Sequence, residues 1–355
     1  MDMDKSSRHY TRNSNIELLR IVIMLMIIGS HYVMNGGVSK TFDPHNMSIN
    51  TLFYEAVSWE GKMGINCFLL ITGYFMCKQE FRWLKFIKLT AQIEFYDWFI
   101  YFFLIIVGMD NLSTISLIAH IPVVNGLKTF TWGYMMLYLL VPFLNIFIKA
   151  LSKKQFQSIL ILLILIYSIF PTLFYSNMFE YIGWYSTMYL VGAYIRNYPS
   201  EWFYNKKIVG GGIFISLSTS ILTVWTITWL SAYIDIMKNF QYLVVDSNKP
   251  LALICSVFLF LFFLHHVKMP NSRRLNQIAL ATFGVLLIHM HSDAMASLLW
   301  GKILRNYDFA ITEYAIPHFF CSVFIVYFSC VTIDLVRIYL LERPLFSFFK
   351  SRINS

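Results

Sequence analysis

Charged residues are scarce in this chain, and that shortage excludes a water-soluble domain of this size. Asp, Glu, Lys and Arg make up 13% of the 355 residues, whereas soluble globular proteins contain about 25%. Hydrophobic residues reach 57% and form runs of about 18–22 residues, the length that a helix needs to span a bilayer. Lipid offers the backbone no hydrogen-bond partner, so these runs must be helices rather than open strands. The composition therefore predicts an all-α, polytopic membrane protein.

Cysteine is also sparse, and its spacing excludes a cysteine-based metal centre. The five cysteines include no C-x-x-C pair and mostly lie inside apolar runs, as small core residues do.

A cleavage site of small residues is missing after the first apolar run, so we expect a retained first span rather than a signal peptide. The Lys and Arg residues behind the net charge of +9 lie between apolar runs. They indicate topology, and we expect no nucleic-acid partner.

We expect about ten transmembrane helices with both termini in the cytoplasm. This arrangement places 21 of the 28 Lys and Arg residues inside or at inner helix ends and leaves 7 outside, as the positive-inside rule requires. Segments 1–15 and 341–355 then form the cytoplasmic ends of a transmembrane domain spanning 16–340, and 35–59 and 231–249 are the longest outer loops. The expected spans are 16–34, 60–77, 89–109, 132–149, 158–175, 183–197, 208–230, 250–267, 277–300 and 314–340.

The first span carries three ionisable residues, which are functional candidates because charge is costly in lipid. Arg20 and His31 are eleven residues apart, so they share one helix face and lie about 16 Å apart along it. A neutral imidazole can take a hydroxyl proton near neutral pH. Alternatively, Arg20 extends to the inner surface and pairs with Glu17 at the i,i+3 spacing.

Two other spans carry ionisable groups at membrane depth. Glu94 and Asp97 lie in the third span, and the ninth contains a short cluster of two histidines and an aspartate. Within that cluster His289 and Asp293 share a face at the i,i+4 spacing, whereas His291 points elsewhere. Metal binding by the ninth-span cluster is conceivable from its residue types, but we expect no metal site.

Seven short motifs occur in an order that resembles the membrane acyltransferase-3 family. Arg20 and His31 match the R-x10-H motif of its first span, and GINCFLLITGYF (64–75) is similar to its second-span signature. Arg82, Lys85 and Lys88 follow where the family places arginines. Four later landmarks also match in order: TWGYMMLYLLVP (131–142), YLVGAYIRNY (189–198), FGVLLIH (283–289) and LERPLFSFFK (341–350). In two places the chain departs from the pattern: Thr72 replaces the usual Ser, and Lys85 and Lys88 replace arginines.

The resemblance implies an O-acyltransferase of the bacterial plasma membrane. The donor would be cytoplasmic acetyl-CoA, or another acyl-CoA, and the acceptor a hydroxyl of a cell-surface polysaccharide such as a capsule, or of its lipid-linked precursor. No permanently bound cofactor is expected. The partners would be the lipid bilayer, the acyl-CoA and the glycan or lipid-linked saccharide.

The resemblance also implies roles for particular residues. His31 would be the general base on the acceptor hydroxyl and Arg20 would orient the donor; a covalent intermediate on His31 stays an alternative. The basic residues Arg82, Lys85 and Lys88 would bind the CoA phosphates. The residues assigned to the substrate are Asn66, Thr72, Tyr74, Trp132 and His289. The three in the second span equally suit helix packing, and Trp132 equally suits an interfacial aromatic.

Two functions of other classes remain open from the sequence. A carrier of a lipid-linked saccharide or another solute would also hold His and Arg within the membrane, and a membrane anchor or sensor needs no turnover. We find no internal repeat, which disfavours a transporter built from duplicated halves.

Overall fold

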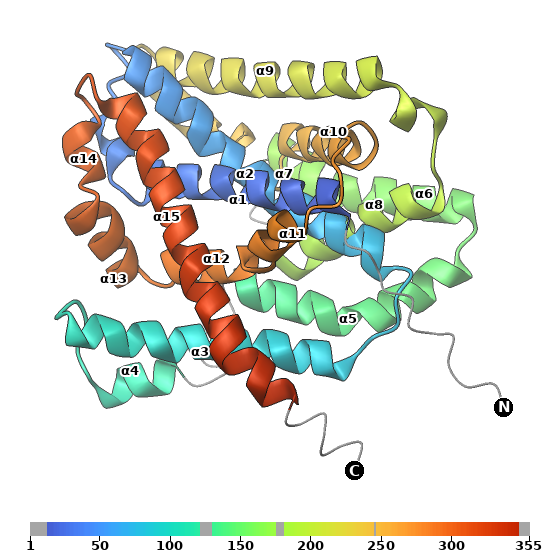
Figure 1. Ribbon diagram of the computed structural model, residues 1–355. Helices are drawn as coiled ribbons and strands as arrows, with labels where there is room; N and C mark the ends of the chain where they lie inside the picture. Colours follow the sequence, from blue (N-terminus) through green and yellow to red (C-terminus); the bar gives the residue numbers. More distant parts are fainter. Residues whose placement is uncertain (1–12, 121–129, 175–180, 245, 348–355) are drawn as a thin grey trace.

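A computed structural model describes residues 13–120, 130–174, 181–244 and 246–347, which form helices and no strand (Figure 1). The helices in chain order are α1 (Ser14–Met34), η1 (Val38–Thr41), α2 (Ile49–Met76), α3 (Trp83–Ile106), α4 (Thr114–Ala119), α5 (Phe130–Ala150), α6 (Lys153–Ile164), η2 (Leu165–Ile169), α7 (Phe170–Leu173), α8 (Tyr181–Asn197), η3 (Glu201–Tyr204), α9 (Lys206–Ser231), η4 (Asp235–Leu243), α10 (Pro250–His265), α11 (Arg273–Leu280), α12 (Thr282–His289), α13 (Asp293–Ala296), η5 (Ser297–Ile303), α14 (Asn306–Phe309), α15 (Ala315–Arg337) and η6 (Ile338–Glu342).

The all-α class is confirmed, and all ten predicted spans fall on helical segments. Six described segments are long and apolar enough to cross a bilayer, or seven if one sharply bent pair counts as a single span. The helices α2, α8 and α10 carry three more of the predicted spans but are too short or too polar to meet the same criterion. The chain is a multi-pass membrane protein, and the count of ten spans and the location of both termini stay predictions. The six segments are Ser14–Met34, Trp83–Ile106, Phe130–Ala150, Lys153–Leu173, Lys206–Ser231 and Ala315–Ser347.

Two sequence-based boundaries are wrong. The predicted span 277–300 is not one straight helix, because Arg273–His289 and Asp293–Ile303 meet at an angle of 97°. The predicted outer loop 35–59 is shorter than expected, because α2 begins at Ile49. Ser48 caps that helix by accepting a hydrogen bond from the backbone N–H of Thr51, a local signal of the kind that starts helices.

The helix α2 lies at the centre of the bundle and packs against α1, α8 and α10. Its closest approach is to α8, where a Cβ atom on Gly73 would collide with the carbonyl oxygen of Tyr189. The contact is reciprocal, since a Cβ atom on Gly192 would meet the carbonyl oxygen of Leu70. Small residues allow such backbone contact between membrane helices. This packing holds the motif-bearing face of α2 in a fixed position beside α1.

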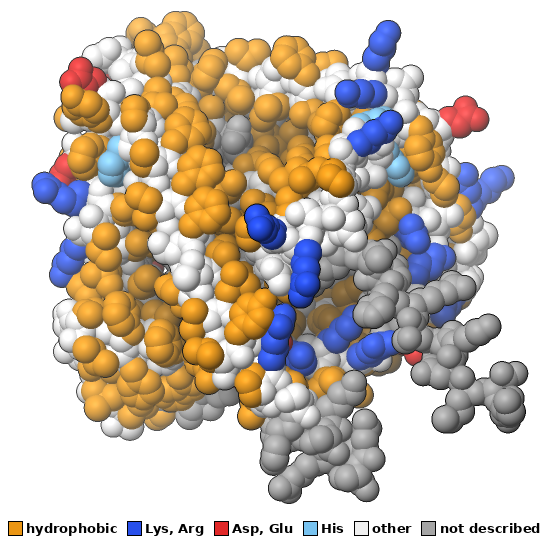
Figure 2. Space-filling view, viewed as in Figure 1, with side chains coloured by type: hydrophobic (Ala, Val, Ile, Leu, Met, Phe, Trp, Pro, Cys, Tyr) orange, Lys and Arg blue, Asp and Glu red, His pale blue; other side chains and the backbone are white. Residues whose placement is uncertain are grey.

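Several of the predicted inner segments meet at one end of the bundle. Ser14, at the start of α1, donates a hydrogen bond from Oγ to Oδ1 of Asn276 at 3.0 Å. In the same region His266 donates from Nε2 to the carbonyl oxygen of Phe203 at 3.0 Å. In Figure 2, apolar side chains cover much of the visible face, and many of the Lys and Arg side chains gather toward its right and lower right. Other Lys and Arg side chains lie at the left and centre of this face, so the view does not by itself assign one basic side, and the topology stays a prediction.

Candidate active site

Three cavities follow one another along the face of α1 that carries Arg20 and His31. The first, which we call the His31 cavity, has a volume of about 500 Å³. The second, the Arg20 cavity, measures about 250 Å³, and the third, the Arg82 cavity, about 810 Å³. Arg20 lines both of the latter two.

Shared walls connect these cavities into a series. Phe68, Phe130 and Leu286 line both the His31 cavity and the Arg20 cavity. Thr72 and Tyr134 line both the Arg20 cavity and the Arg82 cavity. The predicted common face of Arg20 and His31 is therefore one wall of a row of cavities that begins among basic residues.

His31 is held by a second histidine. Its Nδ1 atom lies 3.0 Å from Nε2 of His289, whose side chain is completely buried. Nδ1 of His289 lies 2.6 Å from the carbonyl oxygen of Val285 and must donate to it, because a carbonyl oxygen only accepts. In a neutral His289, Nε2 is then the acceptor, and His31 donates to it from Nδ1. This assignment, inferred from the hydrogen-bond network, leaves Nε2 of His31 as the basic atom of its ring.

Arg20 forms the ion pair that the sequence offered as an alternative to a functional role. Its Nε atom lies 3.8 Å from Oε2 of Glu17, longer than the 2.7–2.9 Å of a strong charge-assisted hydrogen bond. That Nε atom is buried and makes no hydrogen bond to any described residue. The guanidinium is thus positioned by Glu17 while it still lines two cavities.

The three basic residues expected to bind phosphate do not stay together. Arg82 and Lys85 both line the Arg82 cavity. Lys88 instead lies 3.5 Å from Oε1 of Glu342 and packs over the ring of Phe346. Arg82 and Lys85 therefore line the same cavity as Arg20, whereas Lys88 does not.

The residues assigned to the substrate also divide into two groups. Thr72 and Trp132 line cavities, but Asn66 is fully buried and uses both amide atoms within the fold. Its Nδ2 donates to the carbonyl oxygen of Ser247 at 2.7 Å, and its Oδ1 accepts from Trp184 Nε1 at 3.0 Å. The substrate-binding role predicted for Asn66 is not supported by this position.

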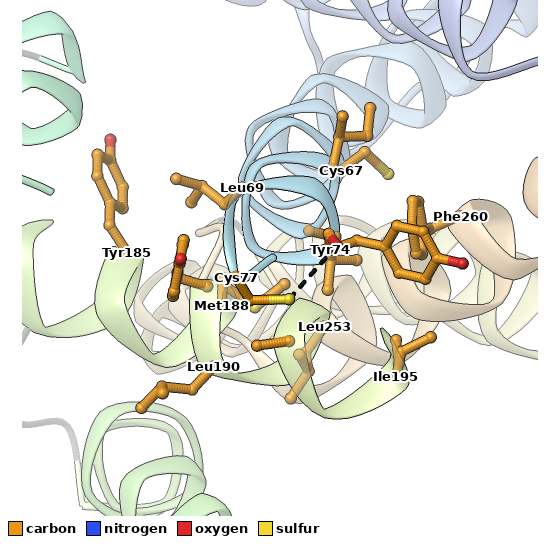
Figure 3. Packing of buried hydrophobic residues seen from close by; sticks show 14 of the residues in the cluster. Cys67, Leu69, Tyr74, Cys77, Tyr185, Met188, Leu190, Ile195, Leu253 and Phe260 are labelled. Atoms are coloured by element: carbon orange, nitrogen blue, oxygen red, sulfur yellow. Dashed lines mark hydrogen bonds between the residues drawn. The ribbon is translucent and has the colours of Figure 1, made fainter. Parts of the chain in front are cut away.

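Tyr74 lies in the packed core and lines none of these three cavities. Figure 3 shows it next to Phe260, with ring centroids 5.5 Å apart. Its hydroxyl accepts a hydrogen bond from Nη1 of Arg196 at 2.9 Å. His289 likewise contacts His31 rather than lining a cavity, so its position favours a role in orienting His31 over the predicted contact with substrate.

A lysine and a histidine that line the His31 cavity were not predicted as site residues. Lys62 lies on α2 inside a predicted span, and its charge at membrane depth was a usable signal. His120 follows α4, in a segment that was predicted as a loop, so nothing local marked it. The third-span residues Glu94 and Asp97 line the same cavity.

The comparisons with known proteins identify the family of the chain. A family model described as an acyltransferase domain matches residues 13–335, which is nearly the whole chain. No curated protein and no solved structure matched the chain in the corresponding searches. The match includes α1 with Arg20 and His31 as well as α12 with His289. On this evidence the chain belongs to the membrane acyltransferase-3 family.

Proposed function

We propose that this protein is an O-acyltransferase that moves an acyl group, most simply acetyl, from cytoplasmic acyl-CoA to a hydroxyl of a cell-surface polysaccharide or its lipid-linked precursor. The observation that carries the proposal is the row of cavities along α1, with Arg20 toward one end and His31 at the other. Such a row lets a charged donor and a saccharide acceptor approach the same reaction centre from opposite sides of the membrane.

The donor binds at the basic end. Arg82 and Lys85 face the Arg82 cavity, where their charges would pair with the phosphates of CoA. In CoA a long pantetheine arm separates those phosphates from the thioester. A donor anchored near Arg82 therefore extends its acyl end past Arg20 toward His31.

The acceptor hydroxyl reacts at His31. Nε2 of His31 removes the hydroxyl proton while the oxygen attacks the thioester carbonyl carbon. The new C–O bond forms, the C–S bond breaks, and the sulfur of CoA leaves as a thiolate that takes the proton from His31. His289 and the carbonyl oxygen of Val285 hold the ring in the required tautomer, and Lys62 lines the same cavity as a cation near the developing negative charge.

A gene-deletion experiment tests the proposal. Surface glycans of the host, compared by NMR with and without the gene, should lose O-acetyl signals while the amount of polymer stays unchanged. Complementation with wild type should restore the signals, and complementation with an equally abundant His31→Ala variant should not. Loss of the polymer itself would instead support a carrier, and unchanged acetylation would exclude the proposed reaction.

A second set of variants tests the position of the base. In the double variant His31→Ala with Ser30→His, the imidazole moves by about 100° around α1. This variant should remain inactive, because the ring no longer meets His289. Arg20→Lys should recover part of the activity lost in Arg20→Ala if charge alone is needed, and little of it if the planar fork is required.

A further inference from the structure

The wall of the His31 cavity contains a cluster of two imidazoles and one carboxylate. Asp97 comes from α3, His120 follows α4, and His291 lies in the break between α12 and α13. One ligand atom from each residue lies within 4.8 Å of the other two. We propose that these three side chains form a binding site for one divalent transition-metal ion, with Zn²⁺ as the ion of matching chemistry.

The hydrogen bonds around His120 suit a metal ligand. Its Nδ1 atom lies 2.7 Å from the carbonyl oxygen of Ser116 and donates to it, which leaves the lone pair on Nε2. Metal-binding histidines usually donate their other ring N–H to a carbonyl or a carboxylate, because this fixes the tautomer and the ring orientation. The ring of His120 is nearly parallel to that of His291, at 18°, with centroids 6.2 Å apart.

The contacts that hold His291 beside Asp97 are long. Its Nε2 atom lies 3.3 Å from Oδ1 of Asp97 and 3.2 Å from the carbonyl oxygen of the same residue, so neither contact is a short charge-assisted bond. A cation between the carboxylate and the imidazoles would be a stronger partner than this shared contact.

The break in the helix places His291 beside Asp97. The two arms of the break meet at 97°, and irregular backbone at membrane depth is tolerated only where it is enclosed by protein or lines a cavity. Here it lines the His31 cavity, and the turn carries His291 to α3. In a straight helix over 277–300, His291 would lie on another face, so the sequence alone did not indicate a contact between His291 and Asp97.

The donor set and its spacing favour zinc chemistry. Two histidines and a carboxylate are common zinc ligands, and three protein ligands leave a coordination position for another molecule. Tetrahedral ligands about 2.0–2.2 Å from zinc lie about 3.3–3.6 Å from one another, so small side-chain rotations would close the present arrangement onto an ion. If the proposed acyl transfer holds, the free position would bind an oxygen of the acceptor saccharide beside His31.

Metal titration of purified protein tests the site without depending on catalysis. The full chain in lipid nanodiscs is stripped with a chelator, washed, and titrated with Zn²⁺ by calorimetry and with Co²⁺ by visible absorption. We expect one Zn²⁺ per chain, and affinity lowered at least about tenfold in Asp97→Asn and in His291→Ala. The matched control is His45→Ala, which removes an exposed outer imidazole and should leave the affinity unchanged.

Folding and catalysis are measured separately. Melting temperatures in the absence of metal identify any variant that fails to fold. If one of the two ligand variants fails to fold, His120→Gln is titrated in its place. Added Zn²⁺ should raise the melting temperature of wild type and of His45→Ala but not that of the ligand variants. Absence of a tight site in wild type, or equal affinity in the ligand variants, would overturn the proposal. Zinc binding without acyl transfer would support the metal site and exclude the proposed function. Acyl transfer without zinc binding would support the proposed function and exclude the metal site.

Discussion

The contact between His31 and His289 gives the sharpest prediction about catalysis. The substitution His289→Phe keeps an aromatic ring at this position but removes the acceptor atom that lies 3.0 Å from Nδ1 of His31. A hydrogen bond between neutral groups contributes about 0.5–1.5 kcal/mol, which corresponds to about a 2- to 13-fold change in rate at 1.36 kcal/mol per tenfold. We therefore expect the kcat of His289→Phe to fall by at least about 2-fold, the lower end of this range.

The comparison with His31 separates positioning from proton transfer. Loss of the general base in His31→Ala should lower turnover by about 10²-fold or more. The double variant His31→Ala with His289→Phe should be no slower than His31→Ala alone, because His289 acts only through His31. His289→Gln should recover part of the rate, since its amide oxygen can accept the hydrogen bond from Nδ1.

The assay measures release of CoA from acetyl-CoA by protein in nanodiscs with a saccharide acceptor. The KM for acetyl-CoA should stay near its wild-type value in His289→Phe, because His289 contacts His31 and not the donor. A folded His289→Phe variant with wild-type kcat would refute the positioning role, and a single variant slower than His31→Ala would show that His289 acts independently.

The remaining predictions concern the donor and the topology. The double variant Arg82→Gln with Lys85→Gln should raise the KM for acetyl-CoA, whereas Lys88→Gln should change it little, because Lys88 pairs with Glu342 outside the cavity. The KM values are measured by steady-state kinetics at varied acetyl-CoA, and an equal rise in Lys88→Gln would contradict the prediction. Cysteine labelling in intact cells should find position 154 inaccessible and position 46 accessible, and accessibility of both from outside would overturn the assignment of the basic loops to the cytoplasm.

Much of the fold followed from the sequence because the bilayer imposes a simple rule. A run of apolar residues must satisfy its own backbone hydrogen bonds, so each of the ten predicted runs falls on helical segments in the described part of the chain, one of them broken after His289. The shared face of Arg20 and His31 was also predictable, because helical periodicity fixes their relative direction within one element. The family of the chain was recognisable from the order of its short motifs, and the family model that matches residues 13–335 confirms it.

Tertiary packing decided which polar residues meet, and no local pattern could supply that information. His31 and His289 are 258 positions apart, yet a single hydrogen bond joins them. Lys88 has the same charge and spacing as its predicted partners but is drawn to Glu342, a residue 254 positions away. Asn66 looked like a polar group for a substrate, but its amide is used in packing between helices.

The break after α12 shows the limit most clearly. Residues 277–300 have the length and apolar content of one span, and hydropathy responds only to those two quantities. The bend of 97° lies where the chain lines the His31 cavity, and backbone can be irregular at membrane depth where it lines a cavity. The sequence therefore determined that this segment is helical and lies in the membrane protein's apolar body, whereas only the packed structure determined that His291 turns toward Asp97 and His120.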